Sequence, residues 1–305
     1  MNLSRNAWRP KGAIPVHFIK SGTWLDDLLL DDCPGMDLTV EMLGIGSMPG
    51  LMEFRPKSSC VVAGVEEAAL LLERCGLAVT RHARNGDRAE EGQLLLEARG
   101  DAAALHRGWK ISQTVMEYMS GIASRAARMV DAARAVNPRV RVAVTRKNFP
   151  GAKRLCLEAA VSGGAVVHRL NLSDSVLVFD QHRIFLAGTG RESGTPLESF
   201  ARRIPEFRLA LPEKKLCAEV DRPEDALLLA EAGIDIVQCE KFPCSVLADT
   251  VRALRAARPD LLILAAGGIN GDNASDYAAT GADELVTTWP YFGKPADIKV
   301  RMSAL

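Results

Sequence analysis

A regular alternation of short apolar strands and helices begins after Asn137-Pro138 and continues almost to the end of the chain. VRVAVT predicts a strand and AKRLCLEAAVSGG a helix, and the same two patterns recur as far as ADELVTT, with glycines at the helix ends. Alternation of this kind predicts a parallel sheet with right-handed crossovers. Five or six such units fall short of the eight in a closed barrel, so we expect an incomplete α/β barrel rather than an open doubly wound sheet.

The first 110 residues have a different pattern. Short alternating apolar segments separated by turn residues, such as MEFRPKSSCVVAGV, predict a small antiparallel sheet with one or two helices. From Ala103 to about Val136 apolar residues recur every three or four positions, which predicts a long helix. Ser120-Gly121 is expected to kink or split that helix. The residues before about position 20 are expected to form a loose extension.

The composition restricts the partners of the protein. The 305 residues carry 38 basic and 38 acidic side chains, so no bulk attraction to nucleic acid or to a membrane is expected. The seven cysteines include no CxxC pair, and several lie in apolar runs, which favours reduced thiols and a cytoplasmic protein. No apolar run reaches the ~18–20 residues that span a bilayer, and the first residues lack the apolar segment of a signal peptide.

Charged and small residues end the successive predicted strands. In α/β barrels and related folds, ligands bind at the carboxyl ends of the strands. These ends would therefore lie together around one site. In chain order the six ends are Thr145, Arg146 and Lys147; His168 and Arg169; Glu219 and Asp221; Glu240 and Lys241; Ala266, Gly267 and Gly268; Thr287 and Thr288.

The chemistry of this set indicates an anionic ligand that also carries hydroxyl groups. Cations placed at the ends of buried strands need partners, and phosphate or carboxylate oxygens can supply them. The carboxylates of Glu219 and Glu240 can bind hydroxyls or a Mg²⁺ ion. Gly267-Gly268, before a predicted helix, can present backbone N–H groups to a phosphate.

Each member of the set also has a structural explanation. Arg146-Lys147 could be a solvated loop pair, His168 a structural histidine, and Gly267-Gly268 an ordinary βα turn. Asp221 is expected mainly to cap the helix that begins at Arg222-Pro223. The functional interpretation therefore rests on all the strand ends together.

Several motifs make the chain resemble a known family. They are, in order, MDLTVEMLG, the glycine-rich run over residues 86–100, HRGWKISQTVMEYMSGIAS, TRKNFPG, HRLNLSDSVLVFDQH, AEVDRPEDAL with AGIDIV, and AAGGIN. In this order they resemble the quinolinate phosphoribosyltransferases, also called carboxylating nicotinate-nucleotide pyrophosphorylases. LHRGWK, TRKNFPGAK, FDQH and the ending YFGKPADIKV are similar to the members of this family that are associated with molybdate-transport operons.

The resemblance implies an architecture and a reaction. It implies an N-terminal α/β sandwich domain and a six- to seven-stranded incomplete α/β barrel, with dimers in which the sandwich of one subunit covers the barrel of the other. The expected bounds are 1–20 for the extension, 21–112 with 292–305 for the sandwich, and 113–291 for the barrel. The family transfers ribose phosphate from phosphoribosyl pyrophosphate, with Mg²⁺, to a ring nitrogen of an aromatic carboxylate and releases pyrophosphate.

The resemblance also implies roles for single residues. Lys147, Glu219 and Glu240 are expected in catalysis, and the two glutamates are expected near Mg²⁺, which would be held largely through the substrate. Arg107 is expected to reach the site of the partner subunit. The other residues expected to bind substrate are Arg146, His168, Arg169, Phe179, Ala266, Gly267, Gly268, Thr287 and Thr288.

The chain departs from the family pattern chiefly where the acceptor would bind. Phe179 in LVFDQH replaces a lysine of the family, Glu240-Lys241 replaces Asp-Asn, and Leu264 and Ala266 stand in place of Glu and Ser. A buried charge pair broken on one side typically costs about 2–5 kcal/mol. We therefore expect weak binding of a dicarboxylate such as quinolinate.

Three functional hypotheses follow. The first is a phosphoribosyltransferase for a small aromatic or heterocyclic acid other than quinolinate, linked to molybdate transport. The second is an anion- or metabolite-binding regulatory protein that keeps the fold and has lost the chemistry. The third is an ordinary quinolinate enzyme with a rearranged pocket.

Overall fold

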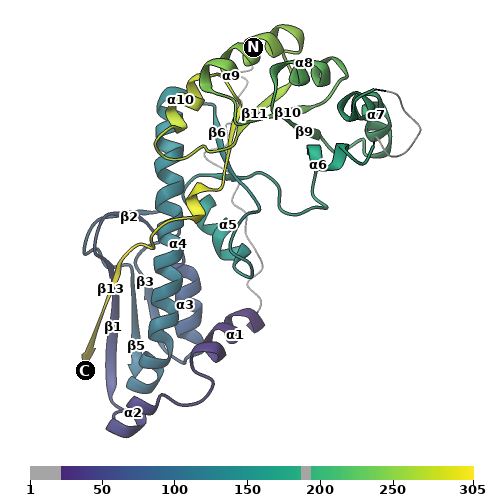
Figure 1. Ribbon diagram of the computed structural model, residues 1–305. Helices are drawn as coiled ribbons and strands as arrows, with labels where there is room; N and C mark the ends of the chain where they lie inside the picture. Colours follow the sequence, from purple (N-terminus) through teal and green to yellow (C-terminus); the bar gives the residue numbers. More distant parts are fainter. Residues whose placement is uncertain (1–21, 187–193) are drawn as a thin grey trace, which may run out of the picture. The chain divides into compact units, whose positions relative to one another are not determined.

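The computed structural model describes residues 22–186 and 194–305 (Figure 1). The extension predicted over residues 1–20 lies outside the described residues. Contacts within the chain group the described residues into two compact units. Unit 1 comprises residues 22–127, 149–166 and 290–305, and unit 2 comprises residues 128–148, 167–186 and 194–289.

Unit 1 contains a four-stranded antiparallel sheet. Its order is β13 (Ile298–Ala304), β1 (Pro49–Pro56), β5 (Leu96–Asp101) and β3 (Ala78–Arg81). The C-terminal strand β13 therefore pairs with β1 near the start of the chain, with Phe54 opposite Val300. A two-stranded ribbon of β2 (Cys60–Val61) and β4 (Arg88–Ala89) completes the predicted antiparallel structure.

Helices pack on one another and on this sheet because their apolar residues share a face. The helices of unit 1 are α1 (Gly22–Asp32), α2 (Leu38–Leu43), α3 (Val65–Arg74), α5 (Lys153–Ser162) and the first part of α4 (Ala102–Val136). Met52 and Phe54 of β1 are fully buried in one cluster with Leu72 of α3 and Met116 of α4. This two-layer packing is an α/β sandwich, as predicted.

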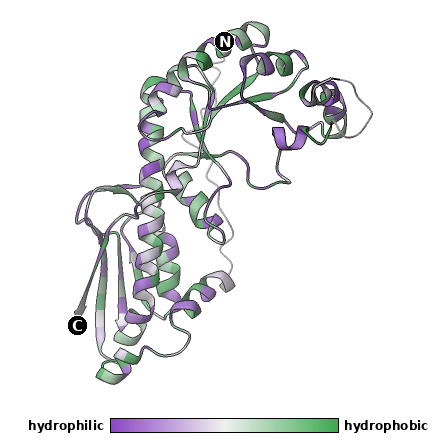
Figure 2. Ribbon diagram, viewed as in Figure 1, coloured by the Kyte–Doolittle hydropathy of each residue, from purple (hydrophilic) through white to green (hydrophobic). Residues whose placement is uncertain are grey.

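Helix α4 runs unbroken through Ser120-Gly121, so the predicted kink is wrong. The Ser120 hydroxyl accepts a hydrogen bond from the Ala63 N–H at 3.0 Å and lies 3.1 Å from the Ala63 carbonyl oxygen. A Cβ on Gly121 would lie 2.8 Å from the Lys294 carbonyl oxygen. The two small residues therefore allow close packing against neighbouring backbone. The alternating colours along α4 in Figure 2 reflect its mixed apolar and polar faces.

Unit 2 is built on a seven-stranded sheet. Its order is β7 (Val166–Val167), β6 (Arg141–Val144), β12 (Glu284–Thr287), β11 (Leu262–Ala266), β10 (Ile236–Glu240), β9 (Leu216–Val220) and β8 (Val176–Val178). The pairs from β6 through to β8 are parallel. The sheet keeps two edges, β7 and β8, within the described residues, which confirms the predicted incomplete barrel.

The helices of unit 2 follow the strands as predicted. They are α6 (Asp180–Arg183), α7 (Pro196–Ala210), α8 (Pro223–Glu231), α9 (Cys244–Ala257) and α10 (Ala274–Ala279), with a 3₁₀ turn η2 (Trp289–Tyr291) at the boundary with unit 1. The prediction that Asp221 caps α8 is wrong, because Arg222 occupies the N-cap position and no side chain caps this end. Pro223 follows at the first helical position, where its missing N–H leaves one unsatisfied donor fewer.

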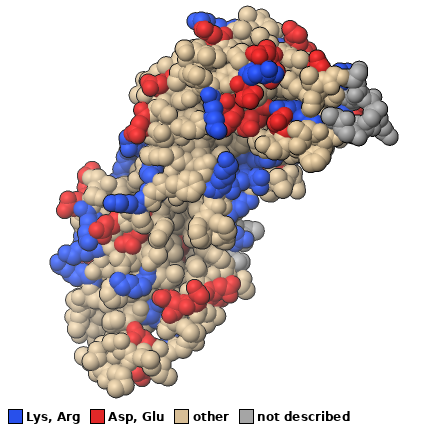
Figure 3. Space-filling model, viewed as in Figure 1, with Lys and Arg blue, Asp and Glu red and all other residues tan. Residues whose placement is uncertain are grey.

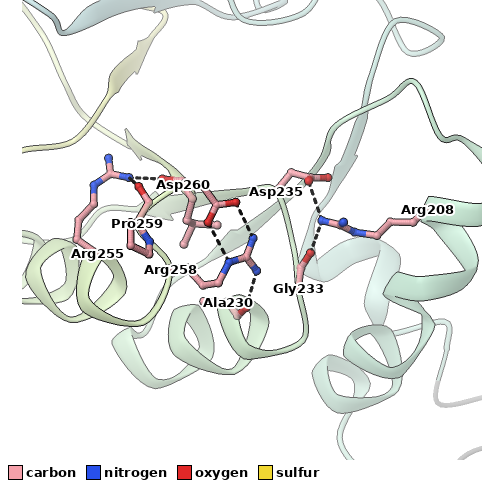
Figure 4. Close-up of polar contacts among 9 residues, drawn as sticks. Arg208, Ala230, Gly233, Asp235, Arg255, Arg258, Pro259 and Asp260 are labelled. Atoms are coloured by element: carbon pink, nitrogen blue, oxygen red, sulfur yellow. Dashed lines mark hydrogen bonds and ion pairs between the residues drawn. The ribbon is translucent and has the colours of Figure 1, made fainter.

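Arginine–aspartate contacts tie the amino ends of the strands in unit 2. The Asp235 carboxylate accepts hydrogen bonds from the Leu216 N–H at 2.9 Å and from Arg208 at 2.8 Å. Asp283 repeats this arrangement, with the Ile263 N–H at 2.8 Å and Arg255 at 2.5 Å. Figure 4 shows the Arg208 contacts beside those of its neighbours Arg255 and Arg258.

Acidic and basic side chains are interspersed on the face that Figure 3 shows, as expected from the zero net charge. None of the seven cysteines is disulfide-bonded, and Cys156, Cys217 and Cys239 are buried, which agrees with the prediction of reduced thiols. Over residues 22–186 and 194–305, no helix combines the length and the apolar character needed to cross a membrane.

Candidate active site

A cavity of about 750 Å³ opens at the carboxyl ends of the parallel strands of unit 2. All the site residues predicted on the strand ends line it except Asp221, and Phe179 lines it too. Arg107 lies on α4 in unit 1 and does not line this cavity. The residues that line it are Thr145, Arg146, Lys147, His168, Arg169, Leu177, Phe179, Gln181, Glu219, Gln238, Glu240, Lys241, Ala266, Gly267, Gly268, Ile269, Asn270, Val286, Thr287, Thr288 and Trp289.

Cations form one wall of the cavity. The ion pairs among the described residues involve neither Arg146 nor Lys147. Arg169 is only 7% exposed, and burial together with the neighbouring Arg146 lowers its pKa. Burial, and then the charge of Arg169, lower the pKa of His168 to about 4. At neutral pH this wall therefore presents permanent cations and one neutral imidazole.

Two carboxylates face the interior from adjacent strands. The Glu219 carboxylate on β9 accepts a hydrogen bond from Gln238 Nε2 at 2.7 Å. Burial and the charge of Glu240 raise the pKa of Glu219, whereas Gln238, Lys147 and Arg183 lower it. The mutual influence of Glu219 and Glu240 indicates that both act on the same space, where positive charge on a ligand would be stabilised.

The two carboxylates do not make a metal site by themselves. No group of three or more histidine, cysteine, aspartate or glutamate side chains that could hold a metal occurs among the described residues. Mg²⁺ is commonly bound through one or two carboxylates, with phosphates of the substrate and water as its other ligands. Glu219 and Glu240 fit such a substrate-borne ion, and they do not form an all-protein metal cage.

The glycines at the end of β11 give the cavity its width at that point. Gly267 and Gly268 have φ angles of 90° and 78°, which favour glycine. A Cβ on Gly267 would lie 2.8 Å from Glu240 Oε1 and 2.5 Å from Lys241 Cγ. Lys241 is itself the described non-glycine residue with positive φ, at 59°, and such strained backbone clusters at functional sites.

The glycines precede helix α10, as predicted. This helix begins at Ala274, so a loop separates it from Gly268. The loop is held by its own amides, since the Asn273 side chain accepts from the Asn270 N–H at 2.8 Å and donates to the Gly268 carbonyl at 3.2 Å. Any phosphate contact here would come from loop N–H groups rather than from a helix terminus.

Threonines join the ends of β6 and β12. The hydroxyls of Thr145 and Thr288 lie 3.0 Å apart, and the Lys147 N–H donates to Thr145 at 3.2 Å. The Thr287 hydroxyl donates to the Ile269 carbonyl at 2.7 Å and is buried. Thr287 therefore supports the glycine loop, while Thr145 and Thr288 position the segment that carries Lys147.

An aromatic surface lies at the β8 side of the cavity. The Phe179 ring stacks on His182 with 5.6 Å between centroids, and the Arg169 guanidinium lies 6.0 Å from the Phe179 ring. His182 Nδ1 also accepts a hydrogen bond from the Phe179 N–H at 2.9 Å. The ring that replaces a lysine is thus held in place, and it can pack against a flat ligand.

The sequence analysis missed seven lining residues, of which Leu177, Ile269 and Val286 are apolar and four carry polar side-chain atoms, namely Gln181, Gln238, Asn270 and Trp289. Of these four, Gln238 stands two residues before Glu240 on β10 and opposite Glu219, so strand alternation could have found it. The other three lie beyond the strand ends, where the sequence carries no periodic signal.

Fold and cavity together define an α/β-barrel enzyme whose site suits an anionic small molecule. Residues 37–120 match the family model of the quinolinate phosphoribosyl transferase N-terminal domain, and residues 122–301 match that of the C-terminal domain. The chain therefore belongs to the quinolinate phosphoribosyl transferase family, whose members are pentosyltransferases that act as nicotinate-nucleotide pyrophosphorylases.

Relatives carry two kinds of name. A protein of Rhodobacter capsulatus named "Putative pyrophosphorylase ModD" is 40% identical over 266 residues, covering 87% of this chain and 98% of that protein. One of the same name from Pasteurella multocida is 34% identical, covering 90% and 95%. A "Probable nicotinate-nucleotide pyrophosphorylase [carboxylating]" of Methanothermobacter thermautotrophicus is 32% identical, covering 82% and 86%.

Solved structures share the fold. The nicotinate-nucleotide pyrophosphorylase of Ehrlichia chaffeensis aligns with a TM-score of 0.81 at 20% identity, covering 93% of this chain and 99% of that chain. NadC from Streptococcus pyogenes aligns with a TM-score of 0.80 at 22% identity, covering 93% and 96%.

Proposed function

We propose that this protein transfers the phosphoribosyl group of phosphoribosyl pyrophosphate to a small aromatic or heterocyclic acid other than quinolinate. The observation that carries the proposal is the cavity itself. It sets the cations Arg146, Lys147 and Arg169 and the carboxylates Glu219 and Glu240 around a single space at the strand ends.

In this reaction the bond from ribose C1 to the pyrophosphate oxygen breaks and a bond from C1 to the acceptor nitrogen forms. Positive charge develops at C1 while negative charge grows on the leaving pyrophosphate. Glu219 and Glu240 would stabilise the first, and Lys147 with Arg169 the second. Bound Mg²⁺ would neutralise further charge on the phosphates. Positioning would supply much of the remaining acceleration.

The acceptor half of the cavity favours an acid with fewer charges than a dicarboxylate. Phe179 offers an aromatic surface where the family has a cation, and His168 is neutral at neutral pH. Arg146 and Arg169 can still hold one carboxylate. A flat ring with one acidic group would stack on Phe179 and pair with these arginines.

Pyrophosphate release tests the reaction. The protein, phosphoribosyl pyrophosphate and Mg²⁺ would be assayed against a panel of heterocyclic mono- and dicarboxylates, with quinolinate as the reference. We expect turnover with a monocarboxylate at least tenfold above that with quinolinate. Absence of turnover with every acceptor on the panel would refute the proposal. It would favour the binding-protein hypothesis, which is motivated by the loss of the lysine at the position of Phe179.

The variant Phe179→Lys sharpens this test, with Phe185→Lys as the matched control, because Phe185 is exposed and does not line the cavity. Phe179→Lys should shift the preference toward quinolinate, because a lysine restores a partner for the second carboxylate. An unchanged acceptor preference would show that Phe179 does not contact the acceptor.

We also propose that the protein acts as a homodimer with a shared site, in which Arg107, exposed on α4, serves the partner subunit. Mixing inactive Arg107→Ala with inactive Lys147→Ala should then restore part of the activity, because hybrid dimers contain one intact site. Absence of recovery after subunit exchange would exclude sharing. A link to molybdate transport and a cytoplasmic location remain predictions, tested by deletion of the gene under molybdate limitation and by cell fractionation.

A further inference from the structure

A second cavity of about 310 Å³ lies beside the edge strand β8 in unit 2. It shares two lining residues, Arg169 and Leu177, with the candidate active site. None of the predicted catalytic residues Lys147, Glu219 and Glu240 lines it. It is therefore a neighbouring space that adjoins the candidate active site at Arg169 and Leu177.

Apolar side chains make up most of the walls of this second cavity. Val176 and Val178 of β8 line one side, and Phe200 and Phe207 of α7 line another. The two phenylalanine rings meet edge to face, with centroids 6.0 Å apart and planes at 74°, which fixes the shape of that wall. A volume of this size is at the lower end of that of small-molecule sites.

The polar residues of the second cavity are basic or neutral. Arg169, Ser175, His182, Arg183 and Arg203 line it, and none of its described lining residues is a carboxylate. The carboxylates that pair with two of these cations are exposed. Asp180 lies 3.5 Å from Arg183 and Glu206 lies 3.3 Å from Arg203, and their side chains are 70% and 68% exposed. The cavity thus has a positive lining inside an apolar wall.

Arg183 is the residue that most needs a further partner. Its side chain is 8% exposed, and its Nη1 donates to the Glu219 carbonyl oxygen at 2.7 Å. Its Nε–H has no hydrogen-bond acceptor among the described residues. A buried donor of a charged group that has no acceptor lowers the stability of the protein.

We infer that the second cavity binds a small amphipathic anion, with an apolar ring or chain between β8 and α7 and a carboxylate or phosphate oxygen accepting from Arg183. Arg203 at the rim would add a second charge contact. An occupant would touch Arg183, whose guanidinium holds the backbone of Glu219, and would therefore lie one residue away from the candidate active site.

Calorimetry with phenylacetate as the probe tests this inference, with the neutral phenylacetamide for comparison. We expect phenylacetate to bind the wild-type protein and phenylacetamide to bind at least tenfold more weakly. Arg203→Glu should weaken phenylacetate binding at least tenfold. The matched control Arg202→Glu, a neighbour on α7 that does not line the cavity, should leave the affinity unchanged.

A second variant tests whether phenylacetate binds in the main cavity instead. Arg146→Ala changes only the main cavity, so it should leave phenylacetate binding intact. Three results would each overturn the inference. They are absence of phenylacetate binding in the millimolar range, equal affinity of Arg203→Glu and wild type for phenylacetate, and a loss of binding that occurs only in Arg146→Ala. No phosphoribosyl pyrophosphate is present in this experiment, so its outcome is independent of the proposed reaction.

Discussion

The two ends of the seven-stranded sheet in unit 2 use the same residue types in opposite ways. At the carboxyl ends, Arg146 and Lys147 form no ion pair with any described residue, and Glu219 and Glu240 repel each other. At the amino ends, Arg208 and Arg255 bind the carboxylates of Asp235 and Asp283. The numbers of charges are similar, and only their pairing differs.

The difference separates residues that stabilise from residues that bind. Each aspartate at the amino ends also accepts a backbone N–H from the neighbouring strand, so its hydrogen bonds lie within the protein. At the carboxyl ends the charges, the neutral His168 and the positive φ of Lys241 cost stability that a ligand can offset. In α/β barrels, catalysis and stability divide along the same line, with catalytic residues at the carboxyl ends of the strands and stabilising residues at the amino ends.

The largest expected effect concerns activity at the carboxyl ends. Lys147→Ala should lower kcat/KM by about 10²–10³-fold, because charge on the leaving pyrophosphate loses a partner. Its melting temperature should stay the same or rise, since one of several like charges is removed. Lys215→Ala, which removes an exposed lysine just before β9, is the control at the amino end and should leave both quantities unchanged. Equal loss of activity in both variants would show that catalysis does not depend specifically on charges at the carboxyl ends.

The next effect is a pH-dependent stability at the amino end of β12. Burial raises the pKa of Glu284 to about 7, against the lowering effect of Arg141. Between about pH 4.5 and 7 the folded protein therefore binds more protons than the unfolded chain. The stability that the protonated Glu284 contributes at low pH is lost as the pH rises through 7. Glu284→Gln should remove this loss of stability. Relative to wild type, the free energy of unfolding of the variant should be higher at pH 8 than at pH 5 by up to about 3 kcal/mol.

Urea unfolding at pH 5 and pH 8 measures this change. Glu213→Gln, at an exposed position near the same end, should show no pH-dependent difference from wild type. A Glu284→Gln protein less stable than wild type at pH 8 would mean that the ion pair with Arg141, at 3.4 Å, outweighs the cost of burial.

A smaller effect is expected for the aspartates that tie the amino ends. Asp283→Asn removes the charge that binds Arg255 and one of the acceptors that face the Ile263 N–H, so the free energy of unfolding should fall by about 2 kcal/mol. Activity of the folded protein should be unchanged. Asp260→Asn is the control, because Asp260 is exposed and pairs with Arg258 at the surface.

The smallest effect is expected for Arg208→Ala. Arg208 is half exposed and contacts the Gly233 carbonyl at 2.6 Å as well as Asp235. Exposed pairs of this kind contribute less than about 1 kcal/mol. A loss of more than twice that amount in thermal unfolding would show that the amino-end contacts act as one cooperative network.

Much of the fold and part of the site could be predicted from local patterns. The alternation after Asn137-Pro138 predicted the incomplete barrel, since parallel strands joined by helices have few packing solutions. The same register brought Arg146, Glu219 and Glu240 to one cavity, because the carboxyl ends of parallel strands share an edge. The capping role of Asp221 was predicted wrongly, because capping depends on the residue at which the helix begins.

The sequence by itself determined the fold class, the family and the cations and carboxylates on the strand ends, because these follow from periodicity and from order along the chain. Only the tertiary structure decided that α4 passes unbroken through Ser120-Gly121 and that Gln238 donates to Glu219. It also decided that Arg183 is buried with no acceptor for its Nε–H among residues 22–186 and 194–305. These features depend on contacts between residues distant in the chain, which no local pattern encodes.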